Sequence, residues 1–207
     1  MAQLYTKGGS TPVTLPFRIK LSDGRSRTDP ASFTAEEIAD AGYVAVSPRP
    51  APGPDQFVSW GGSDWVVRAK TAAELAAEAA AARSALHTQL AGYRWGVETG
   101  GITLPTGIEV ATDDRSKALI NGALESLERG YYTSTKFKAV NGTFTLTLAE
   151  MAPLAEAVSL HVRDCFSAES TVAAQIDTLT DAELSGFDVV AAFDAAMAAQ
   201  AGQGGGV

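Results

Sequence analysis

The spacing of apolar residues separates an extended first part of the chain from a helical second part. From Val13 to Leu21 apolar side chains alternate loosely with polar ones, which is typical of a strand with one buried face. Tyr43–Val46 has the same character, after a short helix that begins at the capping-box sequence Thr34-Ala-Glu-Glu37. We therefore expect residues 1–69 to form a small β-rich module.

Two further features lie within this module. Residues 47–54 read Ser-Pro-Arg-Pro-Ala-Pro-Gly-Pro, and alternating prolines favour a stiff, extended connector. After it, Phe57 to Trp60 and Trp65 to Arg68 flank a short glycine-rich turn and predict a β-hairpin. Trp60 and Trp65 have two interpretations: a cross-strand aromatic pair that stabilises the hairpin, or an exposed platform on which a sugar stacks.

An alanine-rich helix follows, and we expect it to connect two domains over residues 70–93. Thr71-Ala-Ala-Glu74 is a second capping box at its start. Apolar residues spaced by three and four form one stripe along it, and the stripe includes Leu75, Ala79, Ala82 and Leu86. Small alanine side chains let a partner helix approach closely, either from the same chain or from a symmetry mate.

Residues 94–201 have the pattern of a mainly helical domain with one β-hairpin. Thr112-Asp113-Asp114 precedes a helix that we expect to end near Arg129, and Asn141-Gly142 is a strong hairpin turn signal. The remaining expected helices run from Thr147 to about Phe166, from Val172 to Leu179, and from Asp181 to Gln200 with a break near Gly186. Residues 202–207 are glycine-rich, so we expect a disordered tail. The fold class predicted by these patterns is α+β.

Composition narrows the classes of partner. The 207-residue chain has a formal net charge of −8, which disfavours nucleic acid and anionic membrane surfaces. Cys165 is the single cysteine, so an intrachain disulfide is excluded. No apolar run approaches the roughly 20 residues of a membrane span, and Met1 to Lys7 lacks the character of a signal peptide. We expect a soluble protein that is made in a cytoplasm and does not insert into membranes.

Two residue pairs invite a chemical interpretation. His161 and Cys165 lie four apart on one helical face, but a structural zinc takes four ligands, so we expect both to line the core. Asp113 and Asp114 are adjacent, and helix capping explains them better than acid–base chemistry or calcium binding. We predict no catalytic, cofactor-binding or metal-binding residue, and therefore no enzyme.

Several segments from Arg94 onward resemble a domain of unknown function found in tail, tail-fibre and tail-associated proteins of tailed bacteriophages. The first segments are Arg94 to Ile102, Gly107-Ile108, and Thr112 to Ser116 with the helix to Leu127. The later ones are Phe137-Lys138, Asn141-Gly142, Leu146-Thr147-Leu148, His161-Val162 and Cys165-Phe166. Phe137 departs from the pattern, which favours Trp there. Ahead of the domain, Leu21 to Gly24 and Trp60 to Arg68 are similar to the small β modules that often precede it.

The resemblance implies a structural protein of a phage virion, at the tail tip, baseplate or fibre, with residues 1–69 as a docking module. A non-virion chaperone for fibre assembly and a carbohydrate-binding adhesin module are the alternatives. The implied partners are other phage tail proteins, a second copy of the chain in a homo-oligomer, and a host-surface glycan. The expected contact residues are Phe57, Trp60 and Trp65 on the hairpin, and Leu75, Ala79, Ala82 and Leu86 on the alanine-rich helix.

Overall fold

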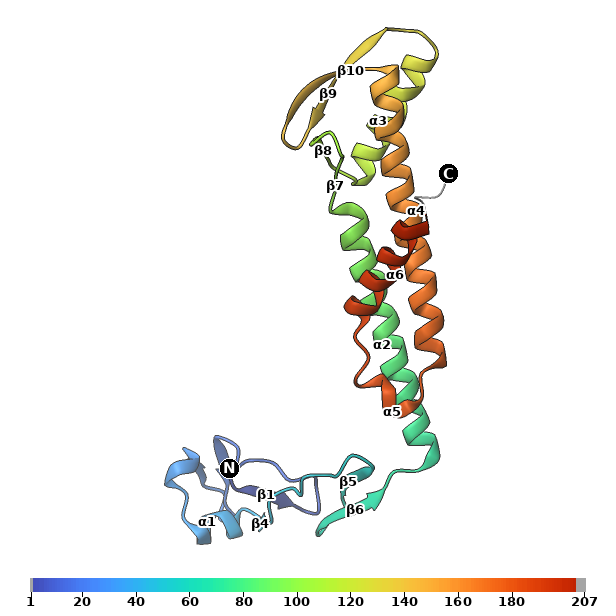
Figure 1. The fold of residues 1–207 in the computed structure, drawn as a ribbon. Helices are drawn as coiled ribbons and strands as arrows, with labels where there is room; N and C mark the ends of the chain where they lie inside the picture. Colours follow the sequence, from blue (N-terminus) through green and yellow to red (C-terminus); the bar gives the residue numbers. More distant parts are fainter. Residues whose placement is uncertain (1, 204–207) are drawn as a thin grey trace. The chain divides into compact units, whose positions relative to one another are not determined.

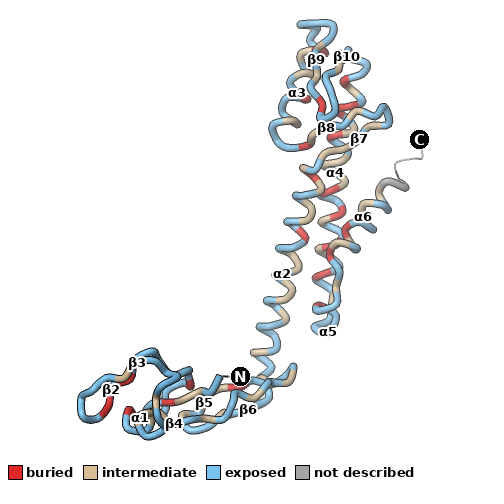
Figure 2. The backbone as a smooth tube through the Cα atoms, turned by 90° about the vertical axis from the view of Figure 1, so that its left-hand side faces the viewer, coloured by how far each residue is buried: buried red, intermediate tan, exposed pale blue. Residues whose placement is uncertain are grey.

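The computed structural model describes residues 2–203, and the chain divides into two compact units between Ala77 and Glu78. Figure 1 labels most elements of both units, and Figure 2 also labels β2 and β3. Antiparallel two-stranded sheets and long helices make up the fold, so the predicted α+β class is confirmed.

Three antiparallel strand pairs form the first unit, each as a two-stranded sheet. They are β1 (Leu4–Lys7) with β4 (Tyr43–Val46), β2 (Arg18–Lys20) with β3 (Ser26–Thr28), and β5 (Gln56–Trp60) with β6 (Trp65–Ala69). The β-rich character of the module is as predicted. Its small core contains the buried residues Ile19, Leu21 and Ala41, and Phe33 and Tyr43 pack against them.

The predicted strand from Val13 to Leu21 is wrong in extent, because only Arg18–Lys20 is a strand. Val13 instead exchanges backbone hydrogen bonds with Tyr5, at 2.8 and 2.9 Å, in an isolated bridge. Pro16 supplies no backbone N–H, so a continuous ladder through this segment lacks a donor.

The predicted capping box at Thr34 is confirmed. The amide of Glu37 donates to the Thr34 hydroxyl at 3.2 Å, and the amide of Thr34 donates to the Glu37 carboxylate at 3.0 Å. These two bonds satisfy amides that α1 (Ala35–Asp40) leaves without an intrahelical partner. A short 3₁₀ helix, η1 (Pro30–Ser32), precedes α1.

The proline-rich segment 47–54 lies within the first unit and is anchored to the β5–β6 hairpin. The Trp65 indole N–H donates to the carbonyl of Ser47 at 2.9 Å, and Arg49 donates to the carbonyl of Val58 at 3.3 Å. The segment therefore joins β4 to β5, and these side-chain contacts hold it against the hairpin that follows it.

Most of the long helix α2 (Ala72–Thr99) belongs to the second unit, which begins at Glu78. The other elements of this unit are β7 (Ile102–Thr103), β8 (Glu109–Val110), α3 (Asp114–Glu128), β9 (Ser134–Ala139), β10 (Gly142–Thr147), α4 (Leu148–Thr178), α5 (Asp181–Leu184) and α6 (Val189–Gln203). The strands pair as two antiparallel hairpins, β7–β8 and β9–β10.

The expected end of the alanine-rich helix near Tyr93 is wrong, because α2 continues to Thr99. Gly92 and Gly96 lie inside the helix, where each costs about 1 kcal/mol relative to alanine. Contacts made beyond Tyr93 offset this cost, including the packing of Val97 against the core and the ion pair between Arg94 and Glu98. The helix stops before Gly101, whose φ of 90° favours glycine.

The helix that starts after Thr147 is also longer than predicted. α4 runs to Thr178 without the expected end near Phe166, so the separate helix Val172–Leu179 is part of it. Ala168, Val172 and Ile176 extend the buried stripe by spacings of four, and no glycine or proline interrupts the helix beyond Pro153. The buried stripe of α4 therefore extends to Ile176, beyond the helix end that was predicted near Phe166.

Two buried clusters stabilise the second unit. One joins α3, the hairpins and the start of α4 through residues that include Ile120, Leu146 and Leu154. The other joins α2, α4 and α6 through residues that include Leu90, Cys165 and Phe193. Figure 2 shows the buried positions of this unit along its helices. Burying large apolar side chains contributes about 1.5–3 kcal/mol each, so these clusters are the main source of stability.

The C-terminal helix confirms the predicted break near Gly186, since α5 ends at Leu184 and α6 begins at Val189. α6 continues through Gln203, so Gly202 and Gln203 of the expected tail are helical, and residues 204–207 lie outside the described residues. Across residues 2–203, no helix is both long enough and apolar enough to cross a membrane.

Candidate functional site

The two tryptophans of the β5–β6 hairpin form a cross-strand pair. Trp60 and Trp65 are directly opposite each other, with ring centroids 5.3 Å apart and an interplanar angle of 71°. Both are half-buried, and the Trp60 indole N–H donates to the carbonyl of Gly9 at 2.9 Å. The Trp65 indole N–H is likewise engaged, at Ser47. This edge-to-face geometry is that of a stabilising aromatic pair and presents no coplanar surface for a sugar.

Phe57, the third expected contact residue of the hairpin, remains 43% exposed. The guanidinium of Arg68 lies 4.7 Å from its ring centroid and is fixed by two hydrogen bonds to Glu74, at 2.6 and 2.7 Å. The hydrogen bonds from Arg68, together with those from Thr71, lower the pKa of Glu74 to about 2. Phe57 therefore presents an accessible aromatic ring beside a fixed positive charge.

The four expected contact residues of the alanine-rich helix have different environments. Leu86 packs against the α2–α4–α6 core, so its assignment to an intermolecular surface is corrected. Ala79 and Ala82 are half-buried, whereas Leu75 is 37% exposed. Arg83 donates to the carbonyl of Leu179 at 2.7 Å, which ties α2 to the end of α4. From Leu86 onward, the apolar stripe of α2 therefore packs against α4 and α6 of the same chain.

The tryptophan with a largely exposed side chain is Trp95 on α2, at 63%. Sequence reasoning selected Trp60 and Trp65 as exposed instead. Flanking glycines indicated a turn there, but they gave no information about the carbonyl groups that meet the indole N–H groups.

A buried ionic network lies where α2 ends and α3 begins. Glu98 is 6% exposed, and its carboxylate accepts a hydrogen bond from Arg94 and one from Lys117 at 2.7 Å. Arg94 also lies 3.2 Å from Glu169 of α4, and Lys117 lies 3.0 Å from Asp114. Three helices therefore meet around one carboxylate.

The charge state of Glu98 follows from opposing effects. Burial alone would raise the pKa of Glu98, but the hydrogen bonds from Lys117 and Arg94 outweigh it, and the pKa lies below its usual range. The hydrogen bonds from Lys117 to Glu98 and Asp114 raise the pKa of Lys117. Both groups are therefore charged at neutral pH.

Backbone contacts join the same two helix ends. The Thr112 hydroxyl is fully buried, donates to the carbonyl of Glu98, and accepts from the amide of Gly101 at 2.9 Å. Thr112 thus links the last turn of α2 to the residue before the N-cap of α3. The segments Arg94 to Ile102 and Thr112 to Ser116 carried part of the sequence resemblance, but the role of Glu98 was missed. The Arg94–Glu98 spacing of four could have indicated it.

Of the two adjacent carboxylates, Asp113 has the predicted capping role, whereas Asp114 lies in the first turn of α3 and forms an ion pair. The Asp113 carboxylate accepts from the Ser116 amide at 3.1 Å and from its hydroxyl at 2.6 Å, which lowers the pKa of Asp113. Asp113 is therefore the N-cap of α3. The Asp114 side chain is exposed and pairs with Lys117 as described above.

Cys165 is fully buried in the α2–α4–α6 core, as expected for a core residue. Its sulfur lies 3.9 Å from Nε2 of His161, and that nitrogen is 3.1 Å from the carbonyl of Val97. Burial raises the pKa of the Cys165 thiol, which disfavours the thiolate that nucleophilic attack requires. Across residues 2–203, no three His, Cys, Asp or Glu side chains lie close enough together to hold a metal ion.

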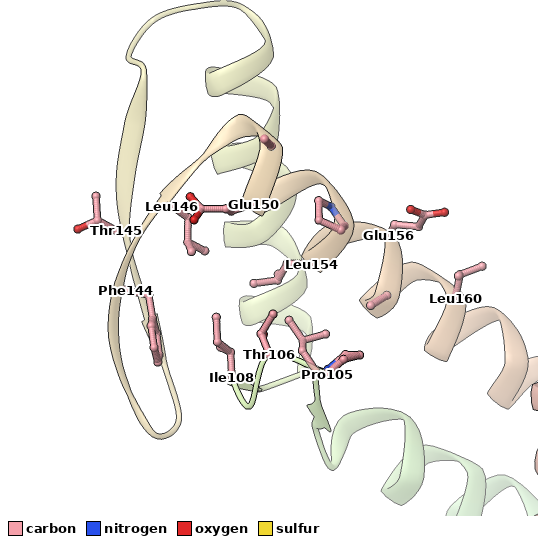
Figure 3. Close-up of a pocket in the computed structure, with 14 residues that line it drawn as sticks. Pro105, Thr106, Ile108, Phe144, Thr145, Leu146, Glu150, Leu154, Glu156 and Leu160 are labelled. Carbon is pink, nitrogen blue, oxygen red and sulfur yellow. The ribbon is translucent and has the colours of Figure 1, made fainter.

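An apolar cleft with a volume of about 920 Å³ opens in the second unit. This volume lies within the range of about 300–1,000 Å³ that is typical of ligand pockets. Its walls come from the β7–β8 turn, from β10 and from one face of α4 (Figure 3). The apolar lining includes Ile108, Phe144, Pro153 and Leu160. No sequence pattern pointed to this cleft, because three separate segments form it.

The charged side chains at the cleft are both acidic, Glu150 and Glu156. Glu150 accepts from the amide and hydroxyl of Thr147 at 2.9 and 2.8 Å, and these bonds lower the pKa of Glu150. Glu156 is exposed and has no ion-pair or hydrogen-bond partner within residues 2–203. No lysine or arginine lines the cleft, so its local charge is negative.

The second unit defines the class of protein, a helical domain with two small β-hairpins and an open apolar cleft. A family model, described as a domain of unknown function (DUF4376), matches residues 81–196. The match covers more than half of the chain, so the protein belongs to this family. No curated protein and no solved structure matches the chain.

The matched segment begins at Ala81, before the expected domain start at Arg94. This agrees with the structure, in which α2 packs within the second unit through Leu86 and Leu90. The family segment therefore contains the α2–α4–α6 core, the Glu98 network and the cleft.

Proposed function

We propose that the chain is a structural component of a tailed-phage virion, at the tail tip, baseplate or fibre, and that it acts through protein–protein interfaces. The tail assignment rests on the resemblance of the segments between Arg94 and Phe166 to tail-associated proteins. The interface assignment rests on the first unit of the structure.

The observation that carries the interface assignment is the imbalance between buried and exposed apolar side chains in the first unit. Its buried hydrophobic residues are few: Ile19, Leu21 and Ala41 of the core cluster, and Val58 of β5. In contrast, Phe17 is 71% exposed, Val44 is 63% exposed and Val13 is 52% exposed. A small unit gains limited stability from such a core, and burying these side chains against a partner adds to it.

The hairpin adds Phe57 to the exposed apolar side chains of this unit, and its ring lies beside Arg68. Aromatic and arginine side chains are enriched among residues that dominate binding energy. We therefore assign the docking role to the first unit, with Phe17 and Phe57 as its main aromatic contacts.

Quantitative mass spectrometry of purified phage particles tests the proposal. We expect the chain at a constant stoichiometric copy number relative to a major tail protein, after washing in high salt. Presence in the infected-cell lysate but absence from washed particles would contradict a virion role and favour an assembly chaperone.

A further inference from the structure

We propose that the cleft in the second unit binds an extended segment of a partner protein, which adds as a strand to the free edge of β10. The segment places apolar side chains in the cleft and a basic side chain beside Glu156. The proposal rests on the proposed function only in taking a protein as the partner.

The free edge of β10 follows from its hydrogen bonds. The Thr147 amide donates to Glu150 at 2.9 Å, so it points away from β9 although Thr147 is paired in register with Ser134. In an antiparallel pair, outward-facing backbone groups recur at every second residue. The amides and carbonyls of Thr143 and Thr145 therefore also face away from β9, and within residues 2–203 no backbone or side-chain group pairs with them.

This edge borders the cleft. Phe144, Thr145 and Leu146 of β10 all belong to the lining, and Figure 3 shows the Thr145 side chain on the opposite side of the strand from Leu146. The β7–β8 hairpin contacts the turn end of the β9–β10 hairpin instead, where the Val140 amide donates to the carbonyl of Glu109 at 2.9 Å. The middle of β10 is left open.

Strand addition matches the shape and chemistry of this site. In such complexes, backbone hydrogen bonds supply affinity and pockets for alternate side chains supply specificity. A strand beside β10 directs every second side chain to the face of Phe144 and Leu146, which line the cleft. Exposed apolar residues such as Leu160 and Pro153 lose contact with water when the cleft is filled.

The negative charge of the cleft favours a basic residue in the bound segment. Glu156 and the ionised Glu150 are the charged side chains of the lining, and the carboxylate of Glu156 is unpaired within the described part of the chain. A lysine or arginine in the bound segment neutralises Glu156, whereas an acidic segment is repelled. The partner segment is therefore extended, has apolar residues at alternating positions, and carries a basic residue.

The test is a selection of randomised octapeptides, displayed without further sequence constraint, against the full-length chain. We expect enrichment of peptides that combine alternating apolar residues with Lys or Arg. Binding of synthesised winners is then compared among wild type, Thr145→Pro and Lys136→Pro. Thr145→Pro removes the outward amide of β10, and Lys136→Pro is the matched control because Lys136 pairs with Thr145 and its amide faces the other edge.

We expect Thr145→Pro to weaken binding at least tenfold and Lys136→Pro to leave it within twofold, with thermal unfolding confirming that both variants are folded. Glu156→Gln, which changes only an exposed side chain, should weaken binding about threefold at low salt.

Failure to enrich any peptide, enrichment of acidic peptides, or equal binding to Thr145→Pro would overturn the proposal. A dimer of the chain that Thr145→Pro dissociates would also overturn it, because the occupant would then be a second copy. Because the assay uses isolated chain, its outcome is independent of whether the chain is found in particles.

Discussion

Lys117 Nζ lies 2.7 Å from Oε1 of Glu98, although 19 residues separate them along the chain. The pair joins the last turn of α2 to the first turn of α3 across the β7–β8 hairpin. With Arg94 and Glu169 it forms the polar centre of the region where α2, α3 and α4 meet. The stretch between the two helices is thus fixed by side chains at its own ends.

Removing the charge of Glu98 should destabilise the second unit. In Glu98→Gln, the partly buried cations of Arg94 and Lys117 lose their common counter-charge. Breaking a buried ion pair costs about 3–5 kcal/mol, so we expect about 2–4 kcal/mol at this slightly exposed site. Urea unfolding followed by circular dichroism measures the change, and Glu128→Gln, at an exposed position of α3, is the matched control with an expected effect below about 0.5 kcal/mol. Equal effects of the two substitutions would disprove a stabilising role for the network.

The difference in stability between wild type and Glu98→Gln should depend on pH. Because the folded-state pKa of Glu98 lies below its unfolded-state value of about 4.3, ionisation contributes stability above that pH. The contribution is lost as the pH falls through the folded-state pKa. The free energy of unfolding should be measured for wild type and Glu98→Gln at pH 7 and at pH 3. The difference between the two proteins should be smaller at pH 3. A difference that is constant over this range would show that Glu98 acts through packing and not through its charge.

Cys165 should be unreactive in the folded protein. Its sulfur is fully buried and burial raises the pKa of the thiol, so little thiolate is accessible at neutral pH. We expect alkylation by iodoacetamide, followed by intact-protein mass spectrometry, to accelerate only when urea unfolds the second unit. Rapid alkylation without denaturant would point instead to an activated cysteine and reopen an enzymatic function.

Trp65→Ala should open the β5–β6 hairpin. The substitution removes the aromatic pair with Trp60 and the hydrogen bond to Ser47, and we expect a loss of about 2 kcal/mol for this half-buried side chain. That loss corresponds to a roughly 30-fold decrease in hydrogen-exchange protection of the β5–β6 amides. Trp95→Ala is the control, since Trp95 is exposed on α2 and should leave hairpin protection unchanged. Unchanged protection in Trp65→Ala, together with loss of binding on a glycan array, would favour the sugar-platform interpretation.

Local motifs predicted where helices begin, because a cap requires only neighbouring residues. Thr71 and Glu74 form both bonds of a capping box, at 2.9 and 3.2 Å, and Asp113 caps α3 as its position indicated. Helix ends were harder to predict. α2 and α4 extend to Thr99 and Thr178 because residues far apart in sequence, such as Leu90 and Phe193, pack together along them.

The candidate sites were also hard to predict wherever they depend on residues far apart in the sequence. The cross-strand contact of Trp60 and Trp65 could be predicted from the hairpin register, but their indole partners, Gly9 and Ser47, lie in other segments. The cleft was missed because three distant segments contribute its walls. The Asn141-Gly142 turn signal predicted the β9–β10 hairpin without indicating that the outer edge of β10 is free.

Cross-linking mass spectrometry on intact, washed particles tests whether the first unit docks onto another virion protein. Lys7, Lys20 and Lys70 lie in the first unit, and Lys117, Lys136 and Lys138 lie in the second, so an amine-reactive reagent samples both. We predict cross-links from the lysines of the first unit to a second virion protein. Absence of the chain from the particle digest, or cross-links confined to the chain itself, would contradict a structural role exercised through protein interfaces.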